Sequence, residues 1–171
     1  MCRPAIATRR GFQSGIVRGH TVLLSAFLIG VIAGLRGFTP PAALGWAARS
    51  GWLDLSGSSL AFLGYRWTPW IFTALAVFEL ISDQRPTTPS RTVPVQFGTR
   101  ILMGGLCGAA LGASGGALVS GLIAGVAGSI VGTLGGKAMR SRMAAAFGSD
   151  RPAALIEDAI AIAGAVLVVM H

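Results

Sequence analysis

The chain has 171 residues, of which 53% are hydrophobic and only 12% are charged, with a formal net charge of +8. A soluble domain carries about a quarter charged residues, so this composition excludes an ordinary soluble domain and indicates an integral membrane protein with the lipid bilayer as its partner. The basic residues flank apolar segments and form no face interleaved with aromatic side chains, which excludes nucleic acid as the expected partner.

The first 18 residues hold four arginines and no acid. We expect residues 1–18 to be a basic, poorly ordered tail, followed by a single transmembrane helical domain at 19–171. Residues 19–35 are uncharged and mostly apolar. As a helix they would be about 25 Å long, which is enough for a slightly short span.

A break is predicted at residues 36–39, where Thr39 suits a helix cap and Pro40 suits the first helical position. The helix that starts there ends near Ser50 and is too short to cross a membrane unaided. The flanking tryptophans Trp46 and Trp52 are typical of the membrane interface. We therefore interpret this helix as re-entrant or interfacial.

A second threonine-proline pair, Thr68-Pro69, predicts a helix that runs to Asp83. Its uncharged part is only about 18 Å long. It completes a span only if Glu79 and Asp83 lie within the membrane or at its edge. Three prolines between residues 86 and 94 then predict an extended or turn-like segment over 84–99.

Residues 101–136 carry no charge and would be about 54 Å long as one helix, against a hydrocarbon core of about 30 Å. We therefore predict two helices with a turn near residues 112–116. Glycines four residues apart let helix backbones approach closely, which favours a tightly packed hairpin; the alternative is that they line a pore. The packing candidates are Gly104, Gly108, Gly112, Gly121, Gly125, Gly128, Gly132 and Gly136.

Basic residues between 137 and 151 mark a loop, and a last helix is predicted from Pro152 to Met170. If the short helix at 40–50 does not cross, the tail, 83–100 and 137–151 share one side with 11 Lys and Arg, against 3 on the other. If it crosses, the split is 6 to 8. The positive-inside rule therefore favours a cytoplasmic N-terminus. The expected fold is an all-α, polytopic integral membrane helical bundle of about five spans plus one short re-entrant or interfacial helix.

Acidic residues at two places point to a polar site. Glu79 and Asp83 lie four residues apart, on one face of their helix, and Glu157 and Asp158 lie in the second turn of the last helix. Four unpaired acids at mid-bilayer would cost on the order of 10 kcal/mol. They must lie near the interface or pair with arginines. The candidate site is Arg36, Glu79, Asp83, Arg85, Arg91, Arg100, Glu157 and Asp158.

Two interpretations of these charges stay open: structural ion pairs, or a site for an ion, a proton or a polar head group. The sequence holds no phosphate-binding glycine loop ending in Lys-Ser/Thr and no HExxH. We therefore assign no catalytic residue, no cofactor and no metal. Magnesium or calcium would fit the four acids only if the last helix packs beside the helix that carries Glu79.

Several segments occur in a characteristic order: Gly34-Leu35-Arg36-Gly37-Phe38-Thr39-Pro40, Glu79-Leu-Ile-Ser-Asp83, Pro89-Ser90-Arg91-Thr92, the glycine-rich hairpin, and Leu155-Ile156-Glu157-Asp158-Ala159. Over roughly residues 20–170 they resemble the bacterial membrane family catalogued as domain-of-unknown-function family 4126. Gln84-Arg85 departs from that family, which has a lysine directly after the aspartate. The resemblance implies a multi-helix protein of a bacterial inner membrane and no particular activity.

Three functions remain in view. The leading hypothesis is a transporter- or channel-like protein whose carboxylate/arginine site binds a cationic or zwitterionic solute or a lipid head group. The alternative is a structural or assembly protein that associates through its glycine faces, either with a partner or with a second copy as a homo-oligomer. The third is a membrane enzyme acting on a lipid head group. The sequence does not identify the solute.

Overall fold

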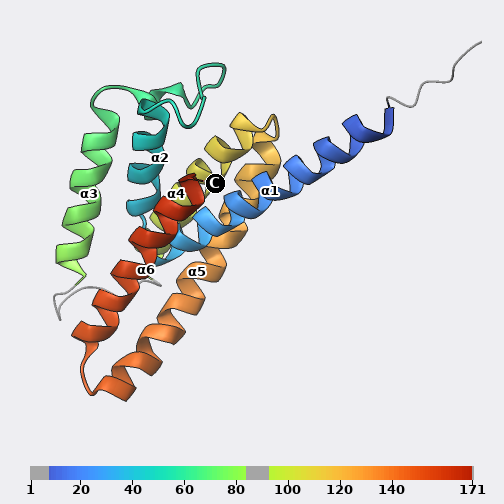
Figure 1. Cartoon of the computed structure of the whole chain (residues 1–171). Helices are drawn as coiled ribbons and strands as arrows, with labels where there is room; N and C mark the ends of the chain where they lie inside the picture. Colours follow the sequence, from blue (N-terminus) through green and yellow to red (C-terminus); the bar gives the residue numbers. More distant parts are fainter. Residues whose placement is uncertain (1–7, 84–92, 171) are drawn as a thin grey trace, which may run out of the picture.

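The computed structural model describes residues 8–83 and 93–170, and the side chains of 19–83, 93–149 and 152–170. This part of the chain is all-α, as the sequence predicts, and contains no strand. Its six α-helices and one short 3-10 helix (Figure 1) are α1 (Thr8–Leu35), α2 (Thr39–Arg49), η1 (Ala61–Gly64), α3 (Thr68–Ser82), α4 (Pro94–Ser114), α5 (Leu118–Phe147) and α6 (Asp150–Met170).

The centre of the bundle is made of α1, α4 and α5, which pack along one another. A methyl group added at Gly108 of α4 would lie 2.7 Å from Gly125 Cα of α5, and one at Gly128 of α5 would lie 2.9 Å from Val31 N of α1. Only glycine allows helix axes to come this close, and such contact replaces the hydrophobic drive that is absent between helices in lipid. The predicted glycine faces are therefore covered by helices of the same chain.

The remaining helices surround this centre. α2 packs on α3 and α6, and α6 also packs on α5 and α1. At the end of α2, the indole of Trp46 donates a hydrogen bond to Thr73 Oγ1 (3.1 Å) and meets the Trp70 ring edge-on at 5.0 Å. These contacts join α2 and α3 into a pair.

The helix boundaries differ from the predictions at three places. α1 begins at Thr8, inside the segment expected to be a tail, and residues 1–7 lie outside the described part. α4 begins at Pro94, so residues 94–99, expected to be extended, are helical; Pro94 occupies the first turn, where a missing N–H costs nothing. α5 continues to Phe147, and the basic loop expected from residue 137 is helix instead.

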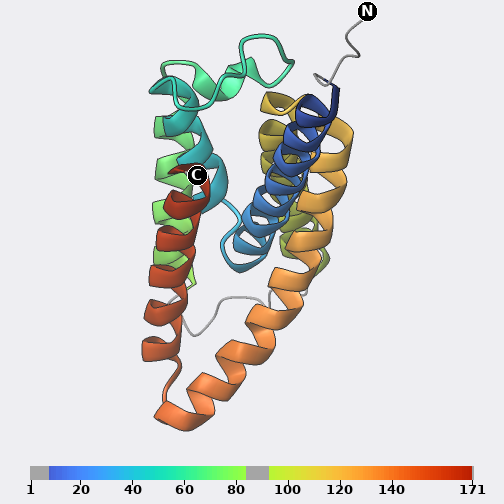
Figure 2. The ribbon, with the colours of Figure 1, turned by 45° about the vertical axis from the view of Figure 1, so that its right-hand side comes forward.

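The end of the bundle at which each loop lies also differs from the expected topology. α2 runs back beside α1, so the start of α1 lies at the same end as residues 50–67 and the turn between α4 and α5 (Figure 2). The end of α3 and the turn between α5 and α6 lie at the opposite end. This arrangement corresponds to the 6-to-8 split of basic residues, and the count of five spans is not confirmed.

Aromatic residues collect at the end of the bundle that contains residues 50–67. Trp52, Tyr65, Trp67 and Trp70 are all more than half exposed there, and the Arg66 guanidinium lies 5.3 Å from the Trp67 ring centre. In the same loop the hydroxyl and backbone N–H of Ser56 donate to Asp54 Oδ1, which holds the pKa of that exposed carboxyl below its ordinary value. An aromatic belt of this kind is typical of a membrane–water interface.

Two of the described helices are long and apolar enough to cross a membrane by length and composition: Leu118–Phe147 and Pro152–Met170. Gly19–Leu35 and Thr68–Ser82 are shorter apolar helices. Large apolar side chains are exposed on the outward faces of the bundle, among them Phe78, Leu102, Ile123 and Leu167. These features are compatible with a membrane protein.

The close packing of α4 on α5 gives a first prediction. Gly108→Ala should lower the free energy of unfolding by about 1–3 kcal/mol, because its methyl group overlaps backbone atoms of α5. Gly135→Ala is the matched control, since an added methyl group meets nothing within 4 Å there. Thermal unfolding in detergent, followed by circular dichroism, should show a lower midpoint for the first variant only. An unchanged midpoint for Gly108→Ala would contradict the packing.

The helix order gives a second prediction. In a Cys2→Ser background, cysteines placed at Thr8 and Ser59 should react with a membrane-impermeant maleimide from one side, and a cysteine at Ser149 from the other. Cys107 is buried and should stay unlabelled. Labelling of Thr8→Cys and Ser149→Cys from the same side of right-side-out vesicles would instead support the five-span arrangement.

Candidate functional site

Arg36 is the centre of the site. It follows the last residue of α1, and its side chain is 0% exposed. Its guanidinium forms ion pairs with Asp83, at the end of α3, and with Asp158, in α6. The acids of two segments far apart in sequence thus converge on one cation, at the break between α1 and α2.

Glu79 closes the same break from α3. One carboxylate oxygen accepts the backbone N–H of Gly37 (2.9 Å) and the other accepts that of Phe38 (3.0 Å). These N–H groups precede the first turn of α2, where a negative charge is favoured by the helix dipole. The prediction from sequence that Thr39 caps α2 is wrong. No side chain of α2 caps its first turn, and the carboxylate of Glu79 in α3 does so instead.

Arg100 and Thr133 bind the last carbonyl groups of α1. Arg100 Nη1 donates to Gly34 O (2.9 Å) and Leu35 O (2.5 Å), and Thr133 Oγ1 donates to Gly34 O (3.3 Å). Arg100 Nη2 also lies 3.4 Å from Glu79 Oε1 and 3.8 Å from Asp83 Oδ2. A helix end inside apolar surroundings needs such partners for its free carbonyls.

Arg140 is a site residue that the sequence prediction missed, because its segment was expected to be a loop. On the continuous helix α5 it lies two turns after Thr133, and thus on the same face. Its Nη2 donates to Asp83 O (3.2 Å) and its Nη1 lies 3.8 Å from Glu157 Oε2. Continuing the helical period of α5 past residue 136 is the signal that would have found it.

We call these seven residues the ion cluster: Arg36, Glu79, Asp83, Arg100, Arg140, Glu157 and Asp158. The cluster brings together all the predicted polar-site candidates except Arg85 and Arg91, which lie outside the described residues. In the part of the chain that the structure describes, no group of three or more His, Cys, Asp and Glu side chains is arranged to hold a metal ion.

Some buried polar atoms at the break have no hydrogen-bond partner among the described residues. They are Nε and Nη2 of Arg36, Oγ1 of Thr39 and Oδ1 of Asp158. The Arg36–Asp158 contact is therefore an ion pair without an aligned hydrogen bond. Buried polar atoms of this kind usually bind ordered water or a small polar ligand.

The uncharged length of α5 fixes the depth of the cluster. Residues 118–136 of α5 carry no charge and, at 19 residues, are about 28 Å long, close to the hydrocarbon thickness of about 30 Å. The cluster meets α5 between Thr133 and Arg140. It therefore lies next to the end of the uncharged run of α5, at the end of the bundle opposite the aromatic belt.

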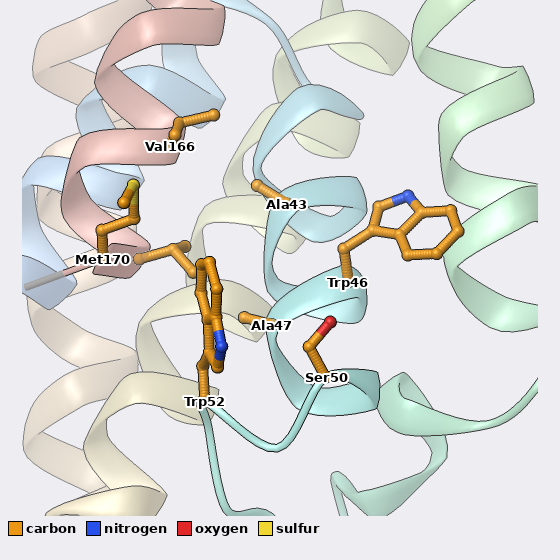
Figure 3. Close-up of a pocket in the computed structure, with 8 residues that line it drawn as sticks. Ala43, Trp46, Ala47, Ser50, Trp52, Val166 and Met170 are labelled. Carbon is orange, nitrogen blue, oxygen red and sulfur yellow. The ribbon is translucent and has the colours of Figure 1, made fainter.

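One cavity at the surface of the described bundle touches the cluster, and another lies at the opposite end. A cavity of about 240 Å³ lies between α3 and α4 and has Glu79, Asp83 and Arg100 in its wall. The other, of about 250 Å³, lies between the ends of α2 and α6 (Figure 3). Trp52 stands there beside Met170 and Val166, while Trp46 turns away toward α3. Among the described residues, no titratable side chain lines this second cavity.

Comparison with protein families supports the resemblance noted from the sequence. Residues 23–171 match the family described as "Domain of unknown function (DUF4126)". The chain belongs to this family. Neither the curated proteins nor the solved structures contain a match. Since the matched region includes every residue of the ion cluster, the cluster lies within the family domain, and its function has to be argued from its geometry.

The shared guanidinium gives a third prediction. Arg36→Met should lower the free energy of unfolding by about 3–5 kcal/mol, because it leaves Asp83 and Asp158 buried without their cation. Adding Asp83→Asn and Asp158→Asn to Arg36→Met should restore part of the loss. Arg49→Met, at an exposed position, is the control. Denaturant unfolding in detergent measures all four proteins; equal stability of Arg36→Met and Arg49→Met would show that Arg36 is not the common partner.

Proposed function

We propose that this chain is a small multi-pass protein of the bacterial inner membrane, of transporter or channel type, whose polar site is the ion cluster. The observation that carries the proposal is the fully buried Arg36 guanidinium, held between acids of α3 and α6 at a break in the helical backbone. Ionisable groups at membrane depth mark ion or substrate pathways in membrane proteins, and broken helices often accompany them.

The surface supports the membrane part of the proposal. Large apolar side chains are exposed along α3, α4, α5 and α6, which would be unfavourable in water and is expected against lipid. The belt of tryptophans at one end and the charged side chains of the ion cluster at the other bound this apolar surface. The uncharged run of α5, about 28 Å long, is close to the thickness of a bilayer core.

The chemistry of the cluster favours a cationic or zwitterionic solute. At the break, Nε of Arg36 and the hydroxyl of Thr39 have no hydrogen bond within the described residues, while Nη2 of Arg36 and Oδ1 of Asp158 contact each other. A ligand that donates to the carboxylates of the cluster and also accepts from the guanidinium of Arg36 would fit these groups. Amino acids and amino alcohols, which carry an oxygen acceptor beside an ammonium group, have this property.

The contacts of α3 indicate how binding of a cation could change the position of this helix. α3 packs on α2 and η1, and its charged end is joined to the remaining helices through Glu79 and Asp83. A cation that takes over one of these acids competes with Arg36 or Arg100. Binding is thereby coupled to the position of α3 relative to the α1–α4–α5 centre. A ligand that makes different contacts in two positions of a helix shifts the equilibrium between them.

The glycine faces give the assembly alternative less support. Gly104, Gly108 and Gly112 of α4 face α5 of the same chain, and Gly128 and Gly132 of α5 face α1. A second copy would have to dock elsewhere on the surface. We therefore place transport ahead of assembly.

The test is flux through proteoliposomes that contain the purified chain. Four probes cover the proposed chemistry: protons, followed with entrapped pyranine, and radiolabelled sodium, ethanolamine and glycine. At least one should cross faster than in protein-free vesicles. Glu79→Gln should reduce that flux by about tenfold or more, since a charged hydrogen-bonding group is lost.

Asp54→Asn is the matched control, because it is also an acid-to-amide change but lies in the exposed loop at the other end. Its flux should equal that of the native chain. No flux with any of the four probes, or equal flux in Glu79→Gln and the native chain, would contradict the proposal.

A further inference from the structure

The cavity between α3 and α4 joins the ion cluster to the outer surface. Its inner wall contains Gly37, Glu79, Asp83 and Arg100. Its rim contains Phe78 of α3 and Val95 of α4, which are 70% and 77% exposed. At about 240 Å³ the cavity is far larger than one water molecule. It is therefore a sideways opening with an apolar rim and a charged floor.

Acceptors dominate the polar groups of the wall. Among the described residues of the wall, three are charged: the acids Glu79 and Asp83 and the base Arg100. Gln96 also lines the cavity, and its buried Oε1 accepts no hydrogen bond from any described residue. The Thr99 hydroxyl donates its proton to Val95 O (2.9 Å), so its oxygen is left as an acceptor. A wall of this kind binds a ligand that is rich in donors, and a primary ammonium group, with three N–H donors and a positive charge, fits it.

The position of the cavity relative to the bilayer indicates which class of molecule carries the ammonium group. The cluster lies at the edge of the apolar layer, where the head groups of a bilayer begin. The rim residue Phe78 of α3 is a large apolar side chain that is exposed on the outer surface of the bundle. A ligand whose head enters between α3 and α4 can therefore keep its hydrocarbon tail in the bilayer.

We propose that this cavity binds a membrane amphiphile with a primary ammonium head, of which an aminophospholipid is the abundant example, with the ammonium group placed among Glu79, Asp83, Gln96 Oε1 and Thr99 Oγ1. The inference rests on the proposed function in so far as it takes the ion cluster to be the ligand site. It adds the substrate class and the direction from which the ligand arrives.

Native mass spectrometry of the chain released from detergent tests this proposal. The chain is titrated with dioleoyl phosphatidylethanolamine, its N,N-dimethyl derivative and dioleoyl phosphatidylcholine, which differ only in the number of N–H donors. Retention should fall along this series, by about tenfold between the first and the last, because each lost donor removes a charge-assisted hydrogen bond.

A double variant keeps the ion cluster intact while it changes the acceptors of the wall. Gln96→Leu combined with Thr99→Val should reduce the tenfold preference to about threefold, because Glu79 and Asp83 still accept hydrogen bonds from the ammonium group. Ser50→Ala changes the wall of the apolar cavity at the other end and should leave the preference unchanged. Equal retention of the three lipids by the native chain overturns the proposal, as does a preference that the double variant leaves undiminished.

Two further measurements distinguish a lipid amine from a soluble amine, and the lipid-binding proposal from the transport proposal. Free ethanolamine at millimolar concentration should not displace the lipid; if it displaces the lipid fully, the ligand is a soluble amine and the amphiphile proposal is overturned. Proton or sodium flux without any lipid preference would retain the transport function and remove this inference. A lipid preference that tracks N–H donors in a chain with no flux would support the inference and contradict transport.

Discussion

One buried guanidinium determines how the helices of this chain are arranged. Arg36 follows α1 directly and contacts acids of α3 and α6, so three helices that are far apart in sequence must meet at its side chain. Each ion taken out of water carries a desolvation cost of several kcal/mol, which only its partners offset. An arrangement that separates any of the three helices would leave a charge buried alone. The ion pairs therefore select among alternative packings, even though their net contribution to stability is small.

Glycine contacts and charge contacts divide the molecule into two parts. The α1–α4–α5 centre is fixed by backbone approaches that no larger residue would permit. The α2–α3 pair is held to that centre differently, through the break at residues 36–38 and the carboxylates of Glu79 and Asp83. Contacts between charges can exchange partners, whereas interlocked backbones cannot without separating. The ion cluster lies on the boundary between the two parts, which is where a ligand could change their relative position.

Local patterns predicted most of the fold, and partners distant in sequence account for what they missed. The uncharged runs and the threonine-proline and glycine signals predicted each of the six α-helices, since these are properties of the segments themselves; the short η1 was not predicted. Thr39 was assigned as a cap because its sequence neighbours favour it, but Glu79 of α3 supplies the cap. Residue 137 was taken as the start of a loop because charges end an apolar span, yet α5 continues and delivers Arg140 to the cluster. The grouping of acids with arginines followed from the cost of burying them unpaired; which acid meets which arginine depends on tertiary packing.

The position of the ion cluster at the edge of the apolar layer bears on what it can do. At mid-bilayer, each exchange of an ion-pair partner would pass through a charge in hydrocarbon, at a cost of about 2.5–3.5 kcal/mol even on insertion scales. At the edge, water and head groups can stabilise the charge that is temporarily released. Arg36 is fully buried, while the side chains of Glu79 and Asp83 keep 12% and 9% of their surface exposed beside the cavity. The acids of α3 also line the cavity between α3 and α4, where Asp83 pairs with Arg36 and Glu79 pairs with Arg100.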